Sequence, residues 1–176
     1  MIGGEQLKIV HKIPVLGLIV LSTFVLLSCQ KEPEYVLDVR DVEHDFEGTG
    51  TLFIWAILQH DEELASSFLS DETRILITQY CSENTVLGCF SNVDYESWGK
   101  IESLFYRPQY STESTAVYQI VFNKLDPAIW FVVDMVPVDG EWRVTNWRGL
   151  VPGIGDPPSG LVDGSYAPNA LSTELP

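Results

Sequence analysis

The sequence of 176 residues predicts an α+β domain, in which helices come first and an antiparallel sheet of about four strands follows. Apolar residues at positions 46, 53, 54, 57 and 58 have the spacing of one helix face. From residue 100 onward the period changes to two, which is typical of half-buried strands. Asp139-Gly140, between the last two of these segments, is a strong signal for a two-residue hairpin turn. The length leaves room for one domain.

The first 28 residues have the pattern of a secretory signal peptide. A basic start with Lys8 and Lys12 precedes Ile13–Ser28, a stretch of sixteen residues without a charge that ends in a small residue. Sixteen helical residues at about 1.5 Å each are shorter than the roughly 30 Å hydrocarbon core of a bilayer. We therefore expect a cleaved signal peptide over residues 1–28, with a transmembrane anchor as the alternative.

The end of this stretch, Leu26-Leu27-Ser28-Cys29, resembles the lipobox of bacterial lipoproteins. The resemblance implies that signal peptidase cuts before Cys29 and that the Cys29 sulfur carries a diacylglycerol, in a lipoprotein that typically holds three acyl chains, palmitate among them. One chain alone gives marginal membrane binding. The prediction is a protein of the bacterial cell envelope that faces outside the cytoplasm, with an incidental cysteine as the alternative. Gln30 is not the Asp that marks inner-membrane retention in some Gram-negative bacteria, so the choice of membrane stays open.

The charge balance excludes one class of partner. The chain has 25 Asp and Glu against 10 Lys and Arg, a formal net charge of −15. Affinity for nucleic acid needs clustered Lys and Arg, so no nucleic-acid partner is expected. An acidic domain tethered beside an anionic membrane would be repelled from the surface, although plain solubility explains the same charge.

The helical half begins after a charged tether, residues 29–44. The first helix is predicted with its secure part at Thr51–Gln59, because Gly48 and Gly50 weaken its start. Two residues that favour N-cap positions then divide the following segment. They predict a helix over Glu62–Leu69 capped by Asp61, and another from Asp71 to about Tyr80 capped by Ser70.

Cys81 and Cys89 are the cysteines left once Cys29 is assigned to the lipid. In an exported protein such a pair in a polar loop is expected to form a disulfide. A redox-active pair, the alternative, usually has the closer Cys-x-x-Cys spacing. A zinc site would need more ligands, and His44 and His60 are not near either cysteine in the sequence. The sequence predicts no metal and no cofactor.

Four strands follow, and then an irregular tail. The tail, residues 149–176, holds 10 Gly or Pro among 28 residues, so an irregular and mobile segment is expected. The predicted strands are Lys100–Tyr106, Thr115–Asn123, Ala128–Val138 and Glu141–Arg148.

Two segments carry a resemblance to a known fold family. They are residues 51–65, TLFIWAILQHDEELA, and residues 138–147, VDGEWRVTNW. Together with the order of helices and strands they resemble the nuclear-transport-factor-2-like superfamily, which includes ketosteroid-isomerase-like and polyketide-cyclase-like domains. The resemblance spans residues 45–148, and it implies a curved, cone-like sheet whose concave face and helices enclose a ligand cavity. His60 stands where the family usually has Gly, and the motifs are structural ones that support a fold and not an activity.

The hairpin turn predicts the register of the last two strands. Counting from Val138 opposite Glu141 places Val133 opposite Asn146 and Phe131 opposite Arg148. A second hairpin, with its loop at 123–128, would place Tyr118 beside Val133. The candidate pocket residues are the polar residues on the predicted core face, namely Tyr118, Asn146 and Arg148. The alternative is that Tyr118 and Asn146 are hydrogen-bonded core residues and that Arg148 reaches solvent.

The opposite face carries an acid and two tryptophans. Asp134 is predicted there, diagonal to Arg143, in an exposed or half-exposed ion pair. Trp130 and Trp147 are predicted to share that face and to pack beneath the tail or another element, or else to meet a partner protein.

The predicted function is a non-catalytic interaction or small-ligand-binding module. Isomerase-type members of the superfamily place a carboxylate in the cavity, whereas the predicted face offers a phenol, an amide and a guanidinium. The expected partners are the membrane, through the lipid on Cys29, and a small ligand or an envelope protein. The alternative is a small cavity enzyme of the same fold that acts on an apolar small molecule through Tyr118 or His60.

Overall fold

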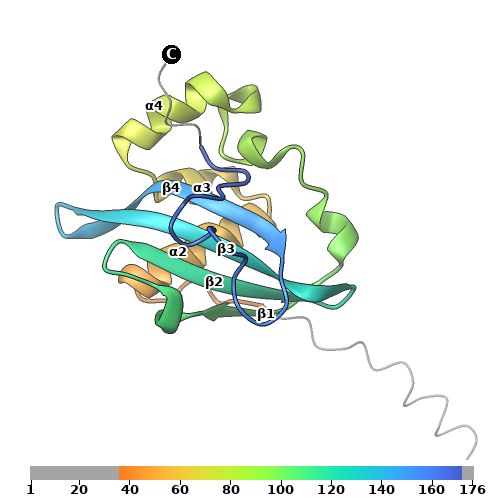
Figure 1. Cartoon of the computed structure of the whole chain (residues 1–176). Helices are drawn as coiled ribbons and strands as arrows, with labels where there is room; N and C mark the ends of the chain where they lie inside the picture. The colour runs from red at the N-terminus through yellow and green to blue at the C-terminus, as the bar shows by residue number, and fades with distance from the viewer. Residues whose placement is uncertain (1–35, 172–176) are drawn as a thin grey trace, which may run out of the picture. The chain divides into compact units, whose positions relative to one another are not determined.

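The computed structural model describes residues 36–171 and confirms the α+β prediction (Figure 1). Three helices precede four strands, with short 3₁₀ turns between them. The predicted signal peptide and Cys29 lie outside the described residues. The helices are α2 (Phe46–Leu58), α3 (Glu62–Ser67) and α4 (Asp71–Tyr80), and the strands are β1 (Ile101–Tyr106), β2 (Thr115–Phe122), β3 (Leu125–Val138) and β4 (Glu141–Pro152).

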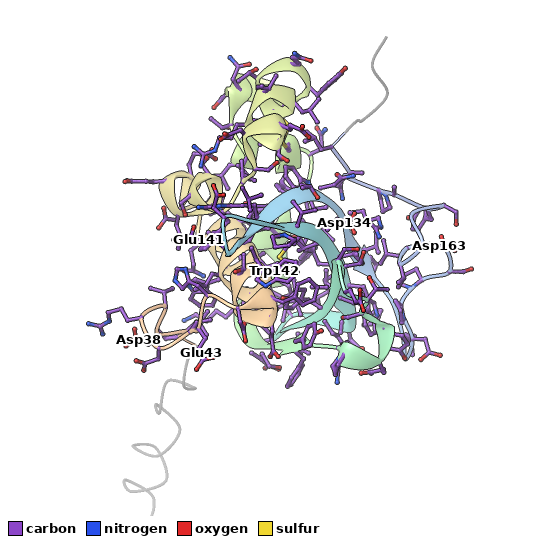
Figure 2. The ribbon with its side chains drawn as sticks, turned by 90° about the vertical axis from the view of Figure 1, so that its left-hand side faces the viewer. Asp38, Glu43, Asp134, Glu141, Trp142 and Asp163 are labelled. Carbon is purple, nitrogen blue, oxygen red and sulfur yellow. A yellow bond between two sulfur atoms is a disulfide. The ribbon has the colours of Figure 1, made fainter. Side chains whose placement is uncertain are left out.

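The four strands form one antiparallel sheet in the order β1-β2-β3-β4. Helix α2 packs on one face, which we call the inner face. The irregular segment 153–171, which we call the strap, crosses the other, outer face. Figure 2 shows the sheet between α2 and the part of the strap that carries Asp163. No helix among residues 36–171 is both long and apolar enough to cross a membrane.

Each helix begins directly after a residue whose side-chain oxygen accepts a hydrogen bond from the first turn. These N-caps are Asp45 for α2, Asp61 for α3 and Ser70 for α4, so both predicted caps are confirmed. Helix α2 starts five residues before the predicted Thr51. Its two glycines lie within the helix and do not end it.

Gly50 is needed because the sheet comes very close to α2. A Cβ at this position would overlap the hydroxyl oxygen of Tyr118. The fully buried Tyr118 side chain crosses from β2, and its hydroxyl donates a hydrogen bond of 2.6 Å to the backbone carbonyl of Glu47. Burial raises the pKa of this phenol far above its ordinary value, so it stays protonated. Tyr118 is thus a hydrogen-bonded core residue, as the alternative prediction stated.

The core between the inner face and the helices is built around aromatic rings. The Trp147 ring lies 5.5 Å from that of Phe53 on α2 and 5.6 Å from that of Phe90. Phe131 of β3 lies 6.0 Å from Phe90 on the same side of the sheet. Full burial of such a side chain contributes roughly 1.5–3 kcal/mol relative to its exposure. These rings occupy the side of the sheet on which the predicted cavity was placed.

The predicted register of β4 is correct near the turn and wrong beyond it. Val138 faces Glu141 and Met135 faces Val144, as predicted. A β-bulge then makes Thr145 an extra residue with no β3 residue opposite it, and residues 146–149 move to the face opposite to the predicted one. The inner face therefore receives Trp147. Asn146 and Arg148, predicted on that face, lie on the outer one.

A second bulge lets β4 continue past its predicted end at Arg148. Phe131 faces Gly149 and Trp130 faces Val151, so Leu150 is the extra residue. Gly149 has a φ of 129°, which favours glycine, and a Cβ there would press on the Trp130 carbonyl and on the backbone of Phe131.

The loop between β2 and β3 is shorter than predicted. Strand β3 begins at Leu125, so the register with β2 moves by two residues and Tyr118 faces Phe131 instead of Val133. A shift of two residues keeps every side chain on its predicted face.

Replacing Gly50 with alanine tests the close approach of α2 and β2. Gly50→Ala should lower the free energy of unfolding by about 1–2 kcal/mol, because the clash with Tyr118 outweighs the higher helix propensity of alanine. Gln79→Ala, at an exposed position of α4, serves as the control and should change stability little. Chemical denaturation measures both. A Gly50→Ala chain as stable as the parent would contradict the packing described.

Candidate functional site

The strap is irregular, as predicted for the tail, but it is packed on the sheet and not loose. Leu161, at its centre, is fully buried against Val117, Trp130 and Val132 on the outer face. The indole nitrogen of Trp130 donates a hydrogen bond of 3.3 Å to the Gly153 carbonyl. Trp130 therefore packs beneath the tail, as predicted. Trp147, predicted beside it, lies in the core on the other face.

Arg148 fastens the middle of the strap. Its side chain is 7% exposed and forms an ion pair with Asp134. Its guanidinium also donates hydrogen bonds of 2.5 Å to the Leu161 carbonyl and 2.6 Å to the Val162 carbonyl. Asp134 was predicted to pair with Arg143 instead. Arg143 instead donates a hydrogen bond to the Ser67 carbonyl and pairs with Glu141. The bulge brings Arg148 beside Asp134 in its place.

The end of the strap is fastened by hydrogen bonds to β4. The Gly149 amide donates to the Pro168 carbonyl at 2.8 Å, and the Asn169 side chain donates to the Gly149 carbonyl at 2.7 Å. The Leu171 amide donates to the side-chain oxygen of Asn146 at 3.2 Å. The segment between the two fastened regions, residues 163–167, is exposed.

These attachments leave a hollow of about 830 Å³ between the strap and the outer face, which we call the strap hollow. Asn146 and Arg148, two of the three predicted pocket residues, line it, whereas Tyr118 lies in the core. Its volume falls within the range of roughly 300–1,000 Å³ that is usual for ligand sites. The sheet contributes Thr115, Asp134, Asn146 and Arg148, and the strap contributes Val162, Asp163, Gly164, Ala167, Ala170 and Leu171.

The strap hollow contains two carboxylates and one guanidinium. Asp134 accepts a hydrogen bond of 2.8 Å from the Thr115 hydroxyl in addition to its ion pair. Hydrogen bonds from the Ser165 amide and hydroxyl hold the pKa of Asp163 below its ordinary value, with a smaller contribution from Arg148. Both oxygens of Asp134 are engaged, so the Asp163 carboxylate and the Asn146 side-chain amide are the groups left to bind a polar ligand.

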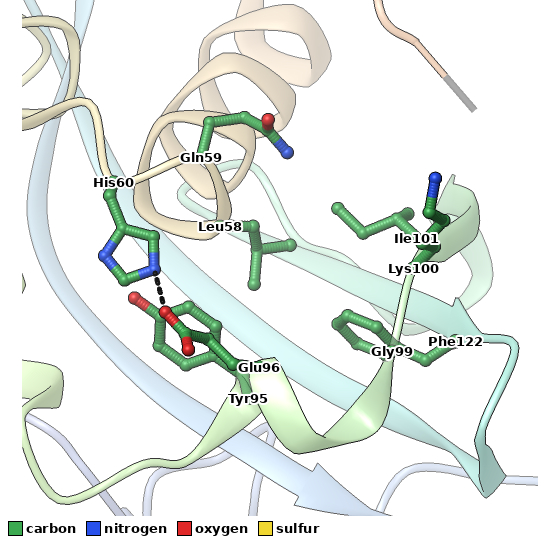
Figure 3. A pocket seen from close by; sticks show the side chains of 9 residues that line it. All are labelled: Leu58, Gln59, His60, Tyr95, Glu96, Gly99, Lys100, Ile101 and Phe122. Carbon is green, nitrogen blue, oxygen red and sulfur yellow. Dashed lines mark ion pairs between the residues drawn. The ribbon is translucent and has the colours of Figure 1, made fainter. Parts of the chain in front are cut away.

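A second hollow of about 380 Å³ lies at the C-terminal end of α2, and we call it the His60 hollow (Figure 3). His60 has a φ of 58° and ends the helix, where its amide donates to the Ile57 carbonyl. The Tyr95 hydroxyl donates to the same carbonyl at 3.3 Å, which fixes the turn Tyr95–Trp98 against the helix end.

Three titratable side chains meet at this hollow. The His60 Nε2 atom lies 3.5 Å from a Glu96 carboxylate oxygen, and the imidazole lies 5.3 Å from the Tyr95 ring. Burial, and to a lesser extent Glu96, raise the pKa of Tyr95. His60 was singled out from the sequence. Tyr95 and Glu96 were missed, because they lie far along the chain in a segment without periodicity.

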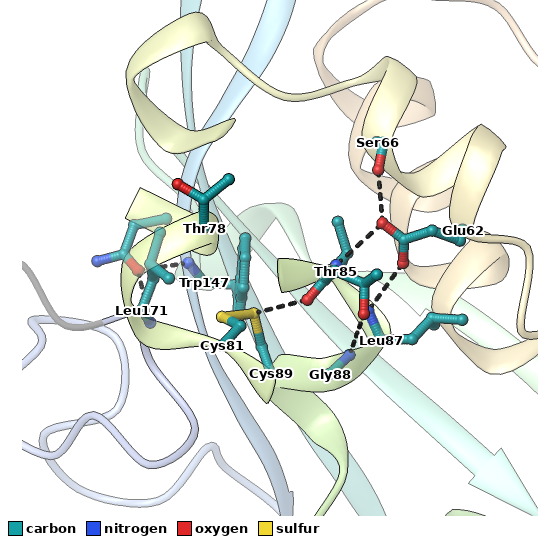
Figure 4. The surroundings of a disulfide bond; sticks show 12 residues. Glu62, Ser66, Thr78, Cys81, Thr85, Leu87, Gly88, Cys89, Trp147 and Leu171 are labelled. Carbon is teal, nitrogen blue, oxygen red and sulfur yellow. Dashed lines mark hydrogen bonds between the residues drawn. A yellow bond between two sulfur atoms is a disulfide. The ribbon is translucent and has the colours of Figure 1, made fainter. Parts of the chain in front are cut away.

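The predicted disulfide between Cys81 and Cys89 is present, with Cα atoms 4.6 Å apart (Figure 4). It closes the loop 81–89, and the next residue, Phe90, is buried in the core. Glu62 of α3 holds the same loop, because its carboxylate accepts hydrogen bonds from the amides of Val86 at 3.0 Å and Leu87 at 2.9 Å. The pair is therefore part of the framework around the core.

Within residues 36–171, no group of three or more His, Cys, Asp or Glu could hold a metal ion. Comparison of the chain with protein-family models, with curated proteins and with solved structures gives no match.

Replacing Arg148 with methionine tests the attachment of the strap. Arg148→Met should lower the free energy of unfolding by about 2–4 kcal/mol, because Asp134 loses its cation and two strap carbonyls lose their donor. Arg40→Met, which removes the exposed ion pair with Asp38, should change stability little, because water screens that pair. Thermal and chemical unfolding compare the two variants.

The double variant Arg148→Met/Asp134→Leu separates the cost of an unpaired Asp134 carboxylate from the cost of the hydrogen bonds lost to the strap. It should recover part of the lost stability, because no unpaired carboxylate remains. If Arg148→Met is no more destabilising than Arg40→Met, the strap does not depend on this ion pair.

Proposed function

We propose that this chain is a lipoprotein of the bacterial cell envelope, anchored to a membrane through lipid on Cys29. The folded domain faces outside the cytoplasm and serves as a non-catalytic interaction or small-ligand-binding module. The lipobox-like residues 26–29 support the anchor. We also propose that the domain belongs to the nuclear-transport-factor-2-like superfamily. The order of helices followed by a four-stranded antiparallel meander, which such membership implies, supports this.

The strap hollow is the observation that carries the binding role. It joins four side chains of the sheet to the strap, and it includes Asn146 and Arg148, which were predicted to line a pocket on the inner face instead. The inner face is packed with aromatic rings, so we place the ligand on the outer face. Carboxylates and an amide favour a small ligand rich in hydrogen-bond donors.

A second candidate function is a small cavity enzyme that acts on an apolar molecule through His60. The convergence of His60, Glu96 and Tyr95 beside a hollow favours it, since a carboxylate next to an imidazole can orient a general base. Tyr118 does not serve this alternative, because its hydroxyl is buried and donates to the Glu47 carbonyl.

Intact mass of the protein from the membrane fraction tests the anchor. The expected mass is that of residues 29–176 plus lipid, and reduction should add two hydrogens as the Cys81–Cys89 bond opens. Cys29→Ser should abolish the lipid mass, whereas Cys89→Ser should keep it. A protein that retains residues 1–28 and carries no lipid would exclude the proposed anchor.

A variant that fills the strap hollow tests the binding role. Ala170 lines the hollow, so Ala170→Phe should prevent the binding of small polar compounds that ligand-observed NMR detects with the parent chain. Ser97→Phe adds the same ring at an exposed position outside both hollows and should leave binding unchanged. Binding that survives in Ala170→Phe would place the ligand elsewhere. Loss of turnover of an apolar substrate in His60→Gln, but not in His44→Gln, would favour the enzyme.

A further inference from the structure

Asn146 can offer a ligand its side-chain nitrogen but not its side-chain oxygen. That oxygen accepts hydrogen bonds from the Trp147 amide at 2.8 Å and from the Leu171 amide at 3.2 Å. These two donors fix which way the amide group points, because an NH₂ group in the same place would accept neither bond. The Asn146 nitrogen has no hydrogen-bond acceptor among residues 36–171, so its N–H groups are free to donate to a ligand in the strap hollow.

Asp163 offers a group of the opposite kind. One of its carboxylate oxygens accepts hydrogen bonds from the Ser165 amide at 2.9 Å and from the Ser165 hydroxyl at 2.7 Å. Its other oxygen has no hydrogen-bond donor within the described part of the chain. The bonds from Ser165 hold the pKa of Asp163 below its ordinary value, so the carboxyl group is charged at neutral pH. Asp163 can therefore accept a hydrogen bond from a cation.

A series of contacts brings these two side chains to one hollow. Asn146 lies directly opposite Asp134 across β3 and β4, and Asp134 forms an ion pair with Arg148. Arg148 in turn is close enough to Asp163 to contribute to the lowering of its pKa, and a Cβ at Gly164 would lie 3.9 Å from the Arg148 Nε atom. Figure 2 shows Asp134 on the sheet and Asp163 on the strap. The free donor and the free acceptor thus belong to the two walls of the strap hollow.

The charges that line the strap hollow do not balance. Arg148 is the single cation among its lining residues, and its guanidinium pairs with Asp134. Asp163 is the second carboxylate, so one negative charge remains. The chain as a whole has a formal net charge of −15, so its other charges do not offset this one on average. A cationic group beside Asp163 is therefore attracted, and an anionic group is repelled.

We propose that the strap hollow binds a small cation in which an ammonium group stands next to a carbonyl group, an inference that rests on the proposed binding role of this hollow. The ammonium group donates to the free oxygen of Asp163, and the carbonyl oxygen accepts from the side-chain nitrogen of Asn146. Ala167 and Ala170 are small and leave room for a short apolar part. A carboxylate ligand meets repulsion from Asp163, and an amine without a carbonyl leaves the Asn146 donor without an acceptor.

Three compounds of nearly equal shape test the proposal on the purified full-length chain. Alaninamide carries both groups, isobutyramide has a methyl group in place of the ammonium, and butan-2-amine lacks the carbonyl. Titration at about pH 6.5 keeps alaninamide protonated, since an α-amino group has a pKa of about 8. The backbone amide shifts of Gly164 and Leu171 report binding by NMR, and alaninamide should bind most tightly. Binding of either other compound that is as tight, or the absence of saturable alaninamide binding, would overturn the proposal.

A variant of the acid tests the ammonium contact. Asp163→Asn should weaken alaninamide binding about two- to fivefold, as expected for an exposed ion pair, and should leave isobutyramide unchanged. Asparagine keeps a side-chain oxygen for the hydrogen bonds from Ser165, so the turn of the strap is retained. Asp156→Asn removes the same charge from the strap outside the hollow and is the matched control. Equal alaninamide affinity in the parent chain and Asp163→Asn would refute the assignment.

A variant of the amide tests the carbonyl contact. Asn146→Asp keeps the oxygen that accepts from the Trp147 and Leu171 amides, but it replaces the nitrogen donor by a second oxygen. This variant should lose the preference for alaninamide over butan-2-amine. A purely structural role of Asn146 would change the two affinities by the same factor and would contradict the contact.

The binding role and the ligand class can fail separately. If no small polar compound binds the parent chain in a way that Ala170→Phe prevents, the binding role of the strap hollow is wrong, and the ligand class falls with it. If compounds bind there and Ala170→Phe prevents it, but alaninamide is not preferred, the binding role stands and the ligand class is wrong.

Discussion

The β-bulge at Thr145 determines both faces of the sheet. Its extra residue turns Trp147 toward the helices and Arg148 toward the strap, so a fully buried tryptophan of the core and the cation that holds the strap depend on one irregular position. Helix α4 supports the bulge. The buried Thr73 hydroxyl donates to the Thr145 carbonyl at 3.0 Å, and the Thr145 hydroxyl donates to the Asp134 carbonyl at 3.1 Å. Backbone groups that a bulge would leave unpaired are thereby satisfied.

The outer face could not remain open to water with this sequence. Val117, Trp130 and Val132 form an apolar surface there, and Leu161 of the strap covers it. The ion pair with Asp134 holds the Arg148 guanidinium in place, and the guanidinium also binds two strap carbonyls. Arg148 therefore fixes which strap residues lie over the sheet. Hydrophobic contact supplies the attraction, and the charged contact supplies the register of the strap. The strap hollow is the space that these two fixed contacts leave.

Local signals in the sequence predicted the helices, the strands and the disulfide, because each depends on a few neighbouring residues. Asp61 and Ser70 each cap the helix that directly follows them, and Asp139-Gly140 forms the hairpin turn without help from distant residues. The faces of β4 beyond Val144 could not be predicted in this way. The bulge depends on Thr73, which lies 72 residues away, and no local pattern marks it. For the same reason two pocket residues were assigned to the wrong face. Gly50 was predicted to weaken the start of its helix, but it lies inside the helix, where the absence of a Cβ lets the Tyr118 side chain approach. No pattern close to Gly50 in the sequence marks this distant contact.

The two hollows differ in what forms them, and this difference bears on how each could act. The strap hollow has one wall without helix or strand, so occupation of it is coupled to the attachment of residues 162–171. The His60 hollow is formed by a helix end, the 3₁₀ turn that holds Tyr95 and the ends of two strands, and hydrogen bonds to the α2 carbonyls hold its parts together. A ligand there meets a preformed surface and orders little on binding, which lowers the entropic cost. A ligand of the strap hollow would instead stabilise the strap, because a molecule that contacts both walls favours the attached state over the detached one. The first hollow is suited to binding alone, and the second couples binding to the state of the chain end.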